Sequence, residues 1–418
     1  MSSFLLFFFL FGLVSPSFSL VSDGLHLLSL MTHWTAIPPS VSSSWNASDL
    51  TPCSWVGVHC DSNSHVDALN LSSYLVSGEL GPVIGYLRNI RSIDLSYNNL
   101  SGSLPSQLGN CTLLQHLDLS FNVFTGRIPE TLGNLVSLKQ LSLYSNKLTG
   151  SIPSQIGNCS QLEELDMSSN RLTGTIPESL WNLQKLKLFN QLSGPIPSNI
   201  GNLSKLLDLE LNNNGISGSI PSSIGNCSSL QTLILGNNQL TGTLPVTLND
   251  LSNITTLDVH NNSLEGSIRF NGGSCNELVY LDLSFNHFNG VLPHELGNCS
   301  TLNQFAAVSC GLSGPIPSSL GQLASLNTLH LSINRLSGKI PPEIGNCKSL
   351  VDLELHANLL EGNIPNEIGM LSQLQILQLF DNRLTGEIPM AIWKIKGLKK
   401  LYIYNNNFQG NYPVRFRK

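Results

Sequence analysis

Hydrophobic and polar positions recur with a fixed period along most of this chain. In residues 117–140, LDLSFNVFTGRIPETLGNLVSLKQ, Leu117 and Leu119 alternate with the polar Asp118 and Ser120. Alternation with a period of two predicts a short strand with one buried face. Nearly the same unit returns every 24 residues, so the strands of successive units are expected to pair in parallel. The pattern therefore predicts a solenoid in which each unit forms one turn of a coil.

One position, usually asparagine, follows each expected strand and sets the register of the repeats. It gives fifteen repeats, with the position occupied by Tyr74, Asn98, Asn122, Asn146, Asn170, Asn190, Asn214, Asn238, Asn262, Asn286, Cys310, Asn334, Asn358, Asn382 and Asn406. A buried amide there can bond the backbone of its own turn and of the next, so we expect an asparagine ladder along the coil. The step from Asn170 to Asn190 is 20 residues instead of 24.

The rest of the unit predicts how each coil closes. Apolar residues such as Phe124, Ile128 and Leu132 are expected to fill the interior. Gly126 permits a bend, and Pro129 fixes an extended φ without donating a hydrogen bond. We therefore expect turns and short helical pieces on the far side of the coil, not a second long sheet.

The N-terminal 65 residues differ from the repeats. Residues 1–19 contain an apolar run, then Pro16 and small residues, which predicts a signal peptide. Residues 1–19 contain no basic residue near Met1, where signal peptides usually have one, so a membrane anchor is the alternative. The apolar run is, however, too short to span a bilayer. Residues 20–65 contain a short helical pattern and the pair Cys53 and Cys60, for which we expect a disulfide. We interpret this segment as a cap, because the first strand of a solenoid must be covered.

The repeats occupy residues 66–410 and are irregular at two places. In residues 181–194 the four missing residues fall where a strand is expected, which predicts a strained or locally unpaired sixth repeat. Residues 411–418, NYPVRFRK, follow the last repeat without a further strand or a closing cysteine pair. We interpret them as a truncated basic tail.

The net charge indicates which classes of partner the chain can bind, and the N-glycosylation sequons indicate its cellular compartment. Charged residues make up 11% of the chain and the net charge is −6, so there is no basic stripe for nucleic acid and a cationic partner is favoured. The N-x-Ser/Thr sequons fit a chain that enters the secretory pathway. They lie at Asn46, Asn70, Asn99, Asn110, Asn158, Asn202, Asn226, Asn253, Asn261 and Asn298.

Catalytic motifs are absent from the sequence. It contains no HExxH, no G-x-S-x-G, no P-loop and none of the kinase signature motifs, so we predict neither an enzyme nor a cofactor. The histidines are scattered, and the nearest pair in the repeats, His330 and His356, falls in different rows of adjacent strands. The sequence therefore predicts no metal site.

Six cysteines share one position, thirteen residues after the ladder residue. Other repeats have leucine or isoleucine there, so cysteine is expected to act as a small buried hydrophobe. Only Cys275 and Cys299 lie in adjacent repeats, where a bridge could form, and the packing role is favoured there too. Cys310 replaces the ladder residue and is expected to be structural. The six are Cys111, Cys159, Cys227, Cys275, Cys299 and Cys347.

These features resemble a known family. The unit x-Leu-x-x-Asn-x-Leu-x-Gly-x-Ile-Pro looks like the plant-type leucine-rich repeat, and CSWVGVHC resembles the cap of plant receptor kinase ectodomains. More narrowly, SDGLHLLSL, TPCSWVGVHCD and SIRFNGGSC are similar to the plant elicitor peptide (Pep) receptors. The resemblance implies an α/β leucine-rich repeat solenoid, a right-handed superhelix with a parallel β-sheet on its concave face and an N-terminal helical disulfide cap. It also implies a peptide ligand along that face, a co-receptor kinase with leucine-rich repeats and, in full-length members, a membrane span and a Ser/Thr kinase.

Candidate binding residues lie on the predicted strands, two and four residues before the ladder residue. Seven carboxylates occupy the fourth position, a column that favours a Lys or Arg ligand: Asp94, Asp118, Asp166, Glu210, Asp258, Asp282 and Glu354. The alternative is that LDLS is simply the common repeat sequence, whatever the ligand. Neighbouring aromatic and histidine residues favour recognition. The peptide-binding set is Tyr144, Asp166, Glu210, Asp258, His260, Asp282, Phe285, His330, Glu354, His356, Phe380, Tyr402 and Tyr404.

We therefore predict a truncated form of the extracellular, peptide-recognising ectodomain of a leucine-rich repeat receptor-like kinase for defence or danger peptides. It is expected in the apoplast, or at the plasma membrane in a full-length form, and to be monomeric without its ligand. The alternatives are a secreted inhibitor of a microbial cell-wall-degrading enzyme and a non-signalling decoy fragment.

Overall fold

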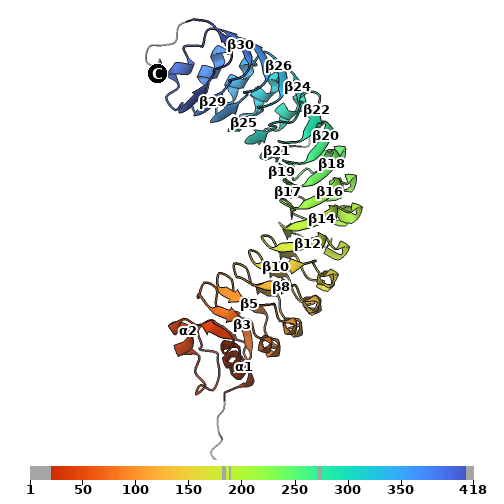
Figure 1. Cartoon of the computed structure of the whole chain (residues 1–418), viewed down its shortest axis with the longest axis vertical. Coiled ribbons are helices and arrows are strands. Elements are labelled where there is room, and N and C mark those ends of the chain that lie inside the picture. Colours follow the sequence, from red (N-terminus) through yellow and green to blue (C-terminus); the bar gives the residue numbers. More distant parts are fainter. Residues whose placement is uncertain (1–19, 181–184, 188–189, 271–274, 411–418) are drawn as a thin grey trace, which may run out of the picture.

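The computed structural model describes residues 20–180, 185–187, 190–270 and 275–410, so the expected signal peptide and basic tail lie outside the described residues. The chain forms a curved rod with the cap at one end (Figure 1). Within the described residues, one parallel sheet of sixteen strands lines the inner side of the curve, with only β2 and β3 antiparallel. Its strands are β2 (Val58–Cys60), β3 (Val66–Asn70), β5 (Ser92–Asp94), β7 (His116–Asp118), β9 (Gln140–Ser142), β11 (Glu164–Asp166), β13 (Lys185–Lys187), β15 (Asp208–Glu210), β17 (Thr232–Ile234), β19 (Thr256–Asp258), β21 (Tyr280–Asp282), β23 (Gln304–Ala306), β25 (Thr328–His330), β27 (Asp352–Glu354), β29 (Ile376–Gln378) and β31 (Lys400–Tyr402).

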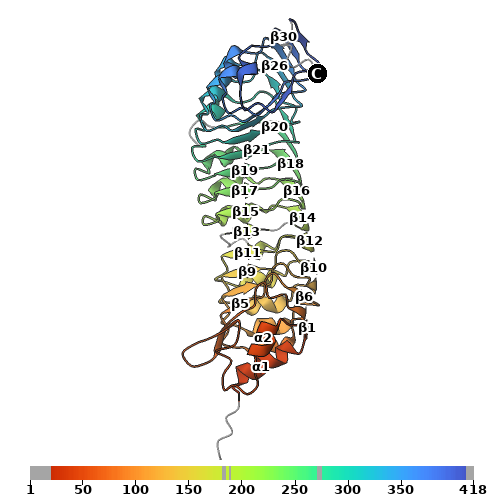
Figure 2. The ribbon, with the colours of Figure 1, turned by 90° about the vertical axis from the view of Figure 1, so that its left-hand side faces the viewer.

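A second series of short strands runs along one edge of the solenoid, which Figure 2 shows beside the main sheet. In the described part of the chain it comprises sheets of three, eight and five strands, and the first includes β1 (Trp34–Ala36) of the cap. The others are β4 (Ser77–Glu79), β6 (Asn99–Ser101), β8 (Thr125–Arg127), β10 (Lys147–Gly150), β12 (Arg171–Thr175), β14 (Gln191–Pro195), β16 (Gly215–Ser219), β18 (Gln239–Thr243), β20 (Ser263–Ser267), β22 (His287–Asn289), β24 (Ser313–Gly314), β26 (Arg335–Gly338), β28 (Leu359–Gly362), β30 (Arg383–Gly386) and β32 (Asn407–Phe408).

The expectation of no second long sheet was therefore wrong. Gly126, with φ 77°, lies within β8, and the recurring glycines place the same short extended segment in register from coil to coil. Pro129 follows the strand as the N-cap of a 3-10 helix, so it does not interrupt the ladder of backbone hydrogen bonds.

The outer side of the coil consists of 3-10 helices, which confirms the expected short helical pieces. They are η1 (Pro82–Tyr86), η2 (Ser106–Asn110), η3 (Glu130–Asn134), η4 (Ser154–Asn158), η5 (Glu178–Leu180), η6 (Ser198–Asn202), η7 (Ser222–Asn226), η8 (Val246–Asp250), η9 (His294–Asn298), η10 (Ser318–Gln322), η11 (Pro342–Asn346), η12 (Asn366–Met370) and η13 (Ile392–Lys394). Between the layers, leucine and isoleucine side chains form one continuous buried core.

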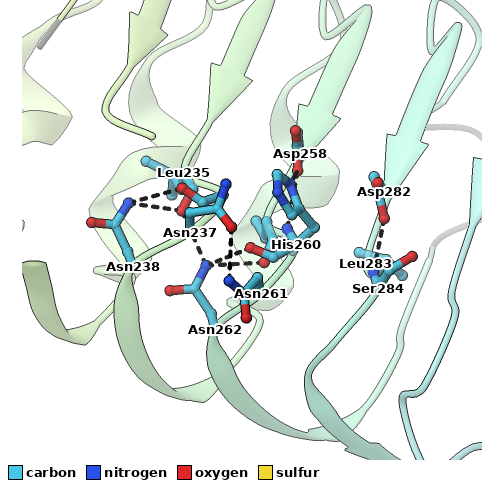
Figure 3. Close-up of polar contacts among 12 residues, drawn as sticks. Leu235, Asn237, Asn238, Asp258, His260, Asn261, Asn262, Asp282, Leu283 and Ser284 are labelled. Atoms are coloured by element: carbon cyan, nitrogen blue, oxygen red, sulfur yellow. Dashed lines mark hydrogen bonds and ion pairs between the residues drawn. The ribbon is translucent and has the colours of Figure 1, made fainter. Parts of the chain in front are cut away.

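The ladder asparagines join neighbouring coils as expected. In Asn286, which is 3% exposed, Nδ2 donates to the carbonyl oxygens of Val259 (3.0 Å), Leu283 (3.0 Å) and Ser284 (3.2 Å). Its Oδ1 accepts the N–H of Leu264 in the preceding coil at 3.0 Å. Figure 3 shows the equivalent donor bonds of Asn262. The ladder satisfies buried backbone groups at the turn.

The cap covers the first strand of the main sheet. It contains the helices α1 (Ser22–Met31) and α2 (Pro39–Ser44), and the expected Cys53–Cys60 disulfide is present. The carboxylate of Asp23 accepts the N–H of Val66 at the start of β3 at 2.9 Å. Trp45 stacks on Trp55 with ring centroids 5.6 Å apart, which gives this small unit an apolar core.

The sixth repeat keeps its strand, contrary to the expectation of a locally unpaired repeat. β13 pairs with β11 and β15 on either side. Leu186 pairs with Leu165, which lies 21 residues earlier in the chain instead of 24. Leu186 also lies four residues before its ladder residue Asn190, whereas Leu165 lies five residues before Asn170. Three of the missing residues therefore precede the strand and one follows it, so the shortening falls in connections and the sheet continues.

The expected packing role of Cys275 and Cys299 was also wrong, because they form a disulfide with their Cα atoms 5.0 Å apart. Their common position brings the two Cα atoms within bridging distance in adjacent coils. The other four cysteines at that position, and Cys310, are buried with free thiols, as expected. Burial raises the pKa of the Cys310 thiol to about 12, which leaves it unreactive.

Candidate functional site

Three rows of side chains face the inner side of the curve. In β27, Asp352 and Glu354 face the inner side of the curve, while Leu353 between them is buried in the core. The residue two positions further supplies the third row. We call these the first, second and third rows; they lie six, four and two residues before the ladder residue in a regular repeat.

The second row contains the predicted column of carboxylates, and a lysine side chain lies among them. Lys187 lies in register between Asp166 and Glu210, and its Nζ is 2.8 Å from Glu210 Oε1. Burial acts to lower the pKa of Lys187, but the hydrogen bond and charge of Glu210 and the charges of Asp166 and Asp208 outweigh it and raise the pKa. Counting four residues back from Asn190 assigned Leu186 to this row, which is why sequence reasoning missed the lysine.

The first row was not among the predicted site residues, although one more step of the same alternation would have found it. His116 Nδ1 lies 2.9 Å from Gln140 Oε1, and Gln140 Nε2 donates to Glu164 Oε2 at 2.7 Å. Side chains of the first and second rows from β5 to β13, with the apolar residues between them, line a groove of about 410 Å³.

Asp258, His260 and Asp282 form a compact polar group on β19 and β21 and in the turn after β19 (Figure 3). Asp258 is 8% exposed, and its Oδ1 accepts the backbone N–H of His260 at 3.0 Å and lies 2.6 Å from His260 Nδ1. The hydrogen bond to Asp258 raises the pKa of His260 against the effect of burial, and the charges of Asp258 and Asp282 add to it. Burial, with the charge of Asp282 next, raises the pKa of Tyr280 to about 12.

Aromatic residues gather at the C-terminal end of the inner face. Phe380 stacks on His356 with ring centroids 4.3 Å apart and on Tyr404 at 4.7 Å, and Tyr402 meets it edge-on at 6.4 Å. Tyr402 and Tyr404 remain exposed. Together with His356 and Phe380 they form the C-terminal aromatic cluster, which presents apolar area to solvent with few rotamers to immobilise.

A second aromatic cluster lies near the cap. Tyr97 stacks on Phe121 at 4.1 Å, and Phe121 meets the predicted Tyr144 at 4.9 Å. Tyr97 and Phe121 precede the ladder residue by one position, where φ is positive (53° and 49°), so they project from the turn. Phe285 occupies this position too, with φ 56°, and lies in the turn after β21, which corrects its assignment to the strand face.

His330 lies beside two carboxylates of the next strand. Its Nε2 is 3.3 Å from Asp352 Oδ2 and 4.0 Å from Glu354 Oε1. Gln378 donates a short hydrogen bond to Glu354. Burial lowers the pKa of His356, which belongs to the third row.

All ten sequon asparagines are exposed, so glycosylation at them stays a prediction that the fold permits. Five of them end 3-10 helices on the outer side: Asn110, Asn158, Asn202, Asn226 and Asn298. Among the residues that the structure describes, no helix has the length and apolarity to cross a membrane.

Comparison with known proteins identifies the modules of the chain. A leucine rich repeat N-terminal domain matches residues 20–61. Leucine rich repeats match residues 89–111, 113–135, 137–159, 161–183, 205–227, 229–251, 277–299, 325–347 and 373–395.

Solved ectodomains of plant receptors are similar over almost the whole chain. The structure of PEPR1 in PEPR1–AtPEP1 has 49% sequence identity and a TM-score of 0.76, covering 94% of this chain and 53% of that one. The HAESA ectodomain of Arabidopsis, in complex with an IDA peptide hormone, has 32% identity and a TM-score of 0.68, covering 94% and 78%. A receptor-like protein kinase of Ipomoea nil is 52% identical over 92 residues, which are 22% of this chain and 8% of that protein. The chain therefore spans about half of the PEPR1 ectodomain structure and a small part of the full-length kinases it matches.

Proposed function

Because this chain belongs to the family of plant leucine-rich repeat receptor kinase ectodomains, we propose that its inner face binds an extended, basic peptide in the apoplast. The observation that carries the proposal is the combination of acidic second-row side chains with the C-terminal aromatic cluster on one continuous sheet. The proposal extends to this chain the peptide binding seen in the complexes of PEPR1 with AtPEP1 and of HAESA with an IDA peptide hormone.

The acidic row supplies an electrostatic match for Lys and Arg side chains. Asp258 and Asp282 lie on paired strands, and Glu354 lies further along the same row. Neighbouring strands are about 4.8 Å apart, so a peptide running across the strands can place side chains against successive carboxylates. Charges on the wall of a concave surface also speed the encounter with a cationic ligand.

The aromatic cluster supplies the apolar contacts that charges in water do not. Exposed acid–base pairs each contribute about 0.2–1 kcal/mol, whereas buried aromatic anchors often contribute 2 kcal/mol or more. Phe380 lies at the centre of the cluster, in contact with His356, Tyr402 and Tyr404. We assign Phe380 as the main anchor for an apolar side chain of the peptide.

The binding test uses the purified, secreted chain with two probes, AtPEP1 and a synthetic Lys/Arg-rich peptide of about 20 residues. Isothermal titration calorimetry should show binding of the basic peptide. The triple variant Asp258→Ala, Asp282→Ala and Glu354→Ala should lose about 0.6–3 kcal/mol of binding free energy, at about 0.2–1 kcal/mol per pair.

The matched control removes the same number of charges from the outer side. Glu130, Glu343 and Glu367 lie on η3, η11 and η12, away from the inner face. Their triple replacement by alanine should leave binding unchanged. Equal losses in both triple variants, or an unchanged affinity after the inner-face changes, would refute the proposed role of the second row.

We further propose that a shorter leucine-rich repeat co-receptor kinase joins the peptide-bound chain and that the chain is monomeric without peptide. The complex of HAESA with IDA and the co-receptor SERK1 is the model for this arrangement. In this family the kinase that signals belongs to the full-length receptor, and we propose a recognition role, not an enzymatic one, for the chain described. Multi-angle light scattering with and without AtPEP1 tests the first step, and a dimer without peptide would contradict it.

A further inference from the structure

Buried polar atoms without a partner gather at one place on the inner face. In the described residues, six side-chain nitrogen or oxygen atoms are buried and make no hydrogen bond. Three of them, His330 Nε2, Asp352 Oδ1 and His356 Nδ1, belong to β25, β27 and the third-row residue after β27. Folded proteins rarely leave such atoms unsatisfied, and a missing ion or water is a common cause.

Strand register brings three possible ligands together here. Asp352 and Glu354 flank the buried Leu353 on β27, so both carboxylates face the same side. His330 on β25 is the register partner of Glu354. One ligand atom from each of these three residues lies within 4.8 Å of the others.

The spacing of these atoms suits a small tetrahedral ion. Zinc bound at about 2.1 Å by imidazole and carboxylate ligands requires ligand atoms about 3.4 Å apart. His330 Nε2 is already 3.3 Å from Asp352 Oδ2 and 4.0 Å from Glu354 Oε1. Gln378 fixes the Glu354 carboxylate from the following strand, as residues behind metal ligands commonly do.

A second group of the same composition provides an internal comparison. Asp258, His260 and Asp282 are equally close, but His260 Nδ1 is hydrogen-bonded to Asp258 Oδ1, which also accepts the backbone N–H of His260. This group is satisfied by its own contacts, and none of its atoms is among the buried atoms without a partner in the described residues. Of the two groups, the His330 group alone contains a buried imidazole nitrogen and a buried carboxylate oxygen that make no hydrogen bond.

We propose that His330, Asp352 and Glu354 form a Zn²⁺ site on the inner face. A mixed nitrogen and oxygen ligand set favours zinc over Ca²⁺ or Mg²⁺, which prefer all-oxygen sites. The three side chains are 28%, 19% and 20% exposed, so the group lies close enough to solvent for an ion to enter. Sequence reasoning predicted no metal site because it compared histidines only with one another and left out the first row, which contains Asp352.

The test measures the binding of Zn²⁺ to the chain in the absence of any peptide, so its outcome does not depend on the proposed peptide ligand. The secreted chain is treated with EDTA, dialysed and titrated with Zn²⁺ in a calorimeter. We expect one ion per chain, and binding at least about tenfold weaker in His330→Ala and in Asp352→Asn. The matched control His260→Ala should bind Zn²⁺ like the wild type.

Three outcomes would overturn the proposal: no Zn²⁺ binding by the wild type, unchanged binding in both site variants, or a loss in the His260 control equal to that in the site variants. Asp352→Asn preserves the shape of the side chain, so it keeps the test decisive if His330→Ala is not secreted. An excess of Ca²⁺ should not displace the Zn²⁺, and displacement would refute the choice of metal. Thermal unfolding of each variant confirms that a loss of binding is not a loss of fold.

Discussion

Replacing Asn286 by alanine should break the link between two adjacent coils. The amide has two hydrogens, which the carbonyl oxygens of Val259, Leu283 and Ser284 share, and its oxygen accepts one hydrogen bond from Leu264. Three hydrogen bonds at about 1 kcal/mol each give about 3 kcal/mol. The alanine variant also leaves the buried Leu264 N–H without its hydrogen-bond partner. We therefore expect the free energy of unfolding to fall by about 3 kcal/mol, within a range of about 2–4 kcal/mol.

Urea unfolding followed by circular dichroism measures this loss as a lower midpoint. Asn286→Cys copies Cys310, whose Sγ donates to the Leu283 carbonyl at 3.2 Å, and should fall between wild type and alanine. Asn366→Ala changes an exposed asparagine on η12 and should stay within about 0.5 kcal/mol. A loss below about 1 kcal/mol in Asn286→Ala, or one no larger than that of the control, would refute the reasoning.

Other parts of the molecule give three further predictions. Phe380→Ala should weaken AtPEP1 binding by about 2 kcal/mol or more in calorimetry while thermal stability changes little; unchanged affinity would remove it as an anchor. Replacing Cys275 and Cys299 by serine opens a bridge between residues 24 apart and should cost about 3 kcal/mol in urea unfolding; an unchanged midpoint would contradict this. Because its partner Asp258 raises the pKa of His260, the native state holds the proton more tightly. The stability advantage of wild type over His260→Gln should therefore be full below the unfolded pKa of about 6.5 and disappear as pH rises through the folded pKa; equal differences in melting temperature at pH 5 and pH 8 would contradict it.

A repeat period predicts the contacts that recur in every coil, and it does not predict contacts that occur in one place only. The position of Asn286 in its unit was enough to predict the ladder, because the same turn repeats in every coil. Lys187 was missed because a deletion changes the spacing locally, and only strand pairing reveals which residue faces out. Cys275 and Cys299 were expected to pack as small apolar residues because other repeats have leucine at their position. They form a disulfide instead, because their Cα atoms lie 5.0 Å apart in adjacent coils.

The sequence by itself determined the architecture: the strand alternation, the 24-residue period, the cap with its Cys53–Cys60 bridge and the family resemblance all follow from local spacing. Tertiary structure decided which side chains meet across strands. The approach of His330 to Asp352 and Glu354 depends on the register between β25 and β27. The stacking of Phe380 on Tyr404 likewise depends on two adjacent coils. The physical reason is that contacts between coils depend on the relative placement of residues about 24 positions apart, which the pattern within one unit does not specify.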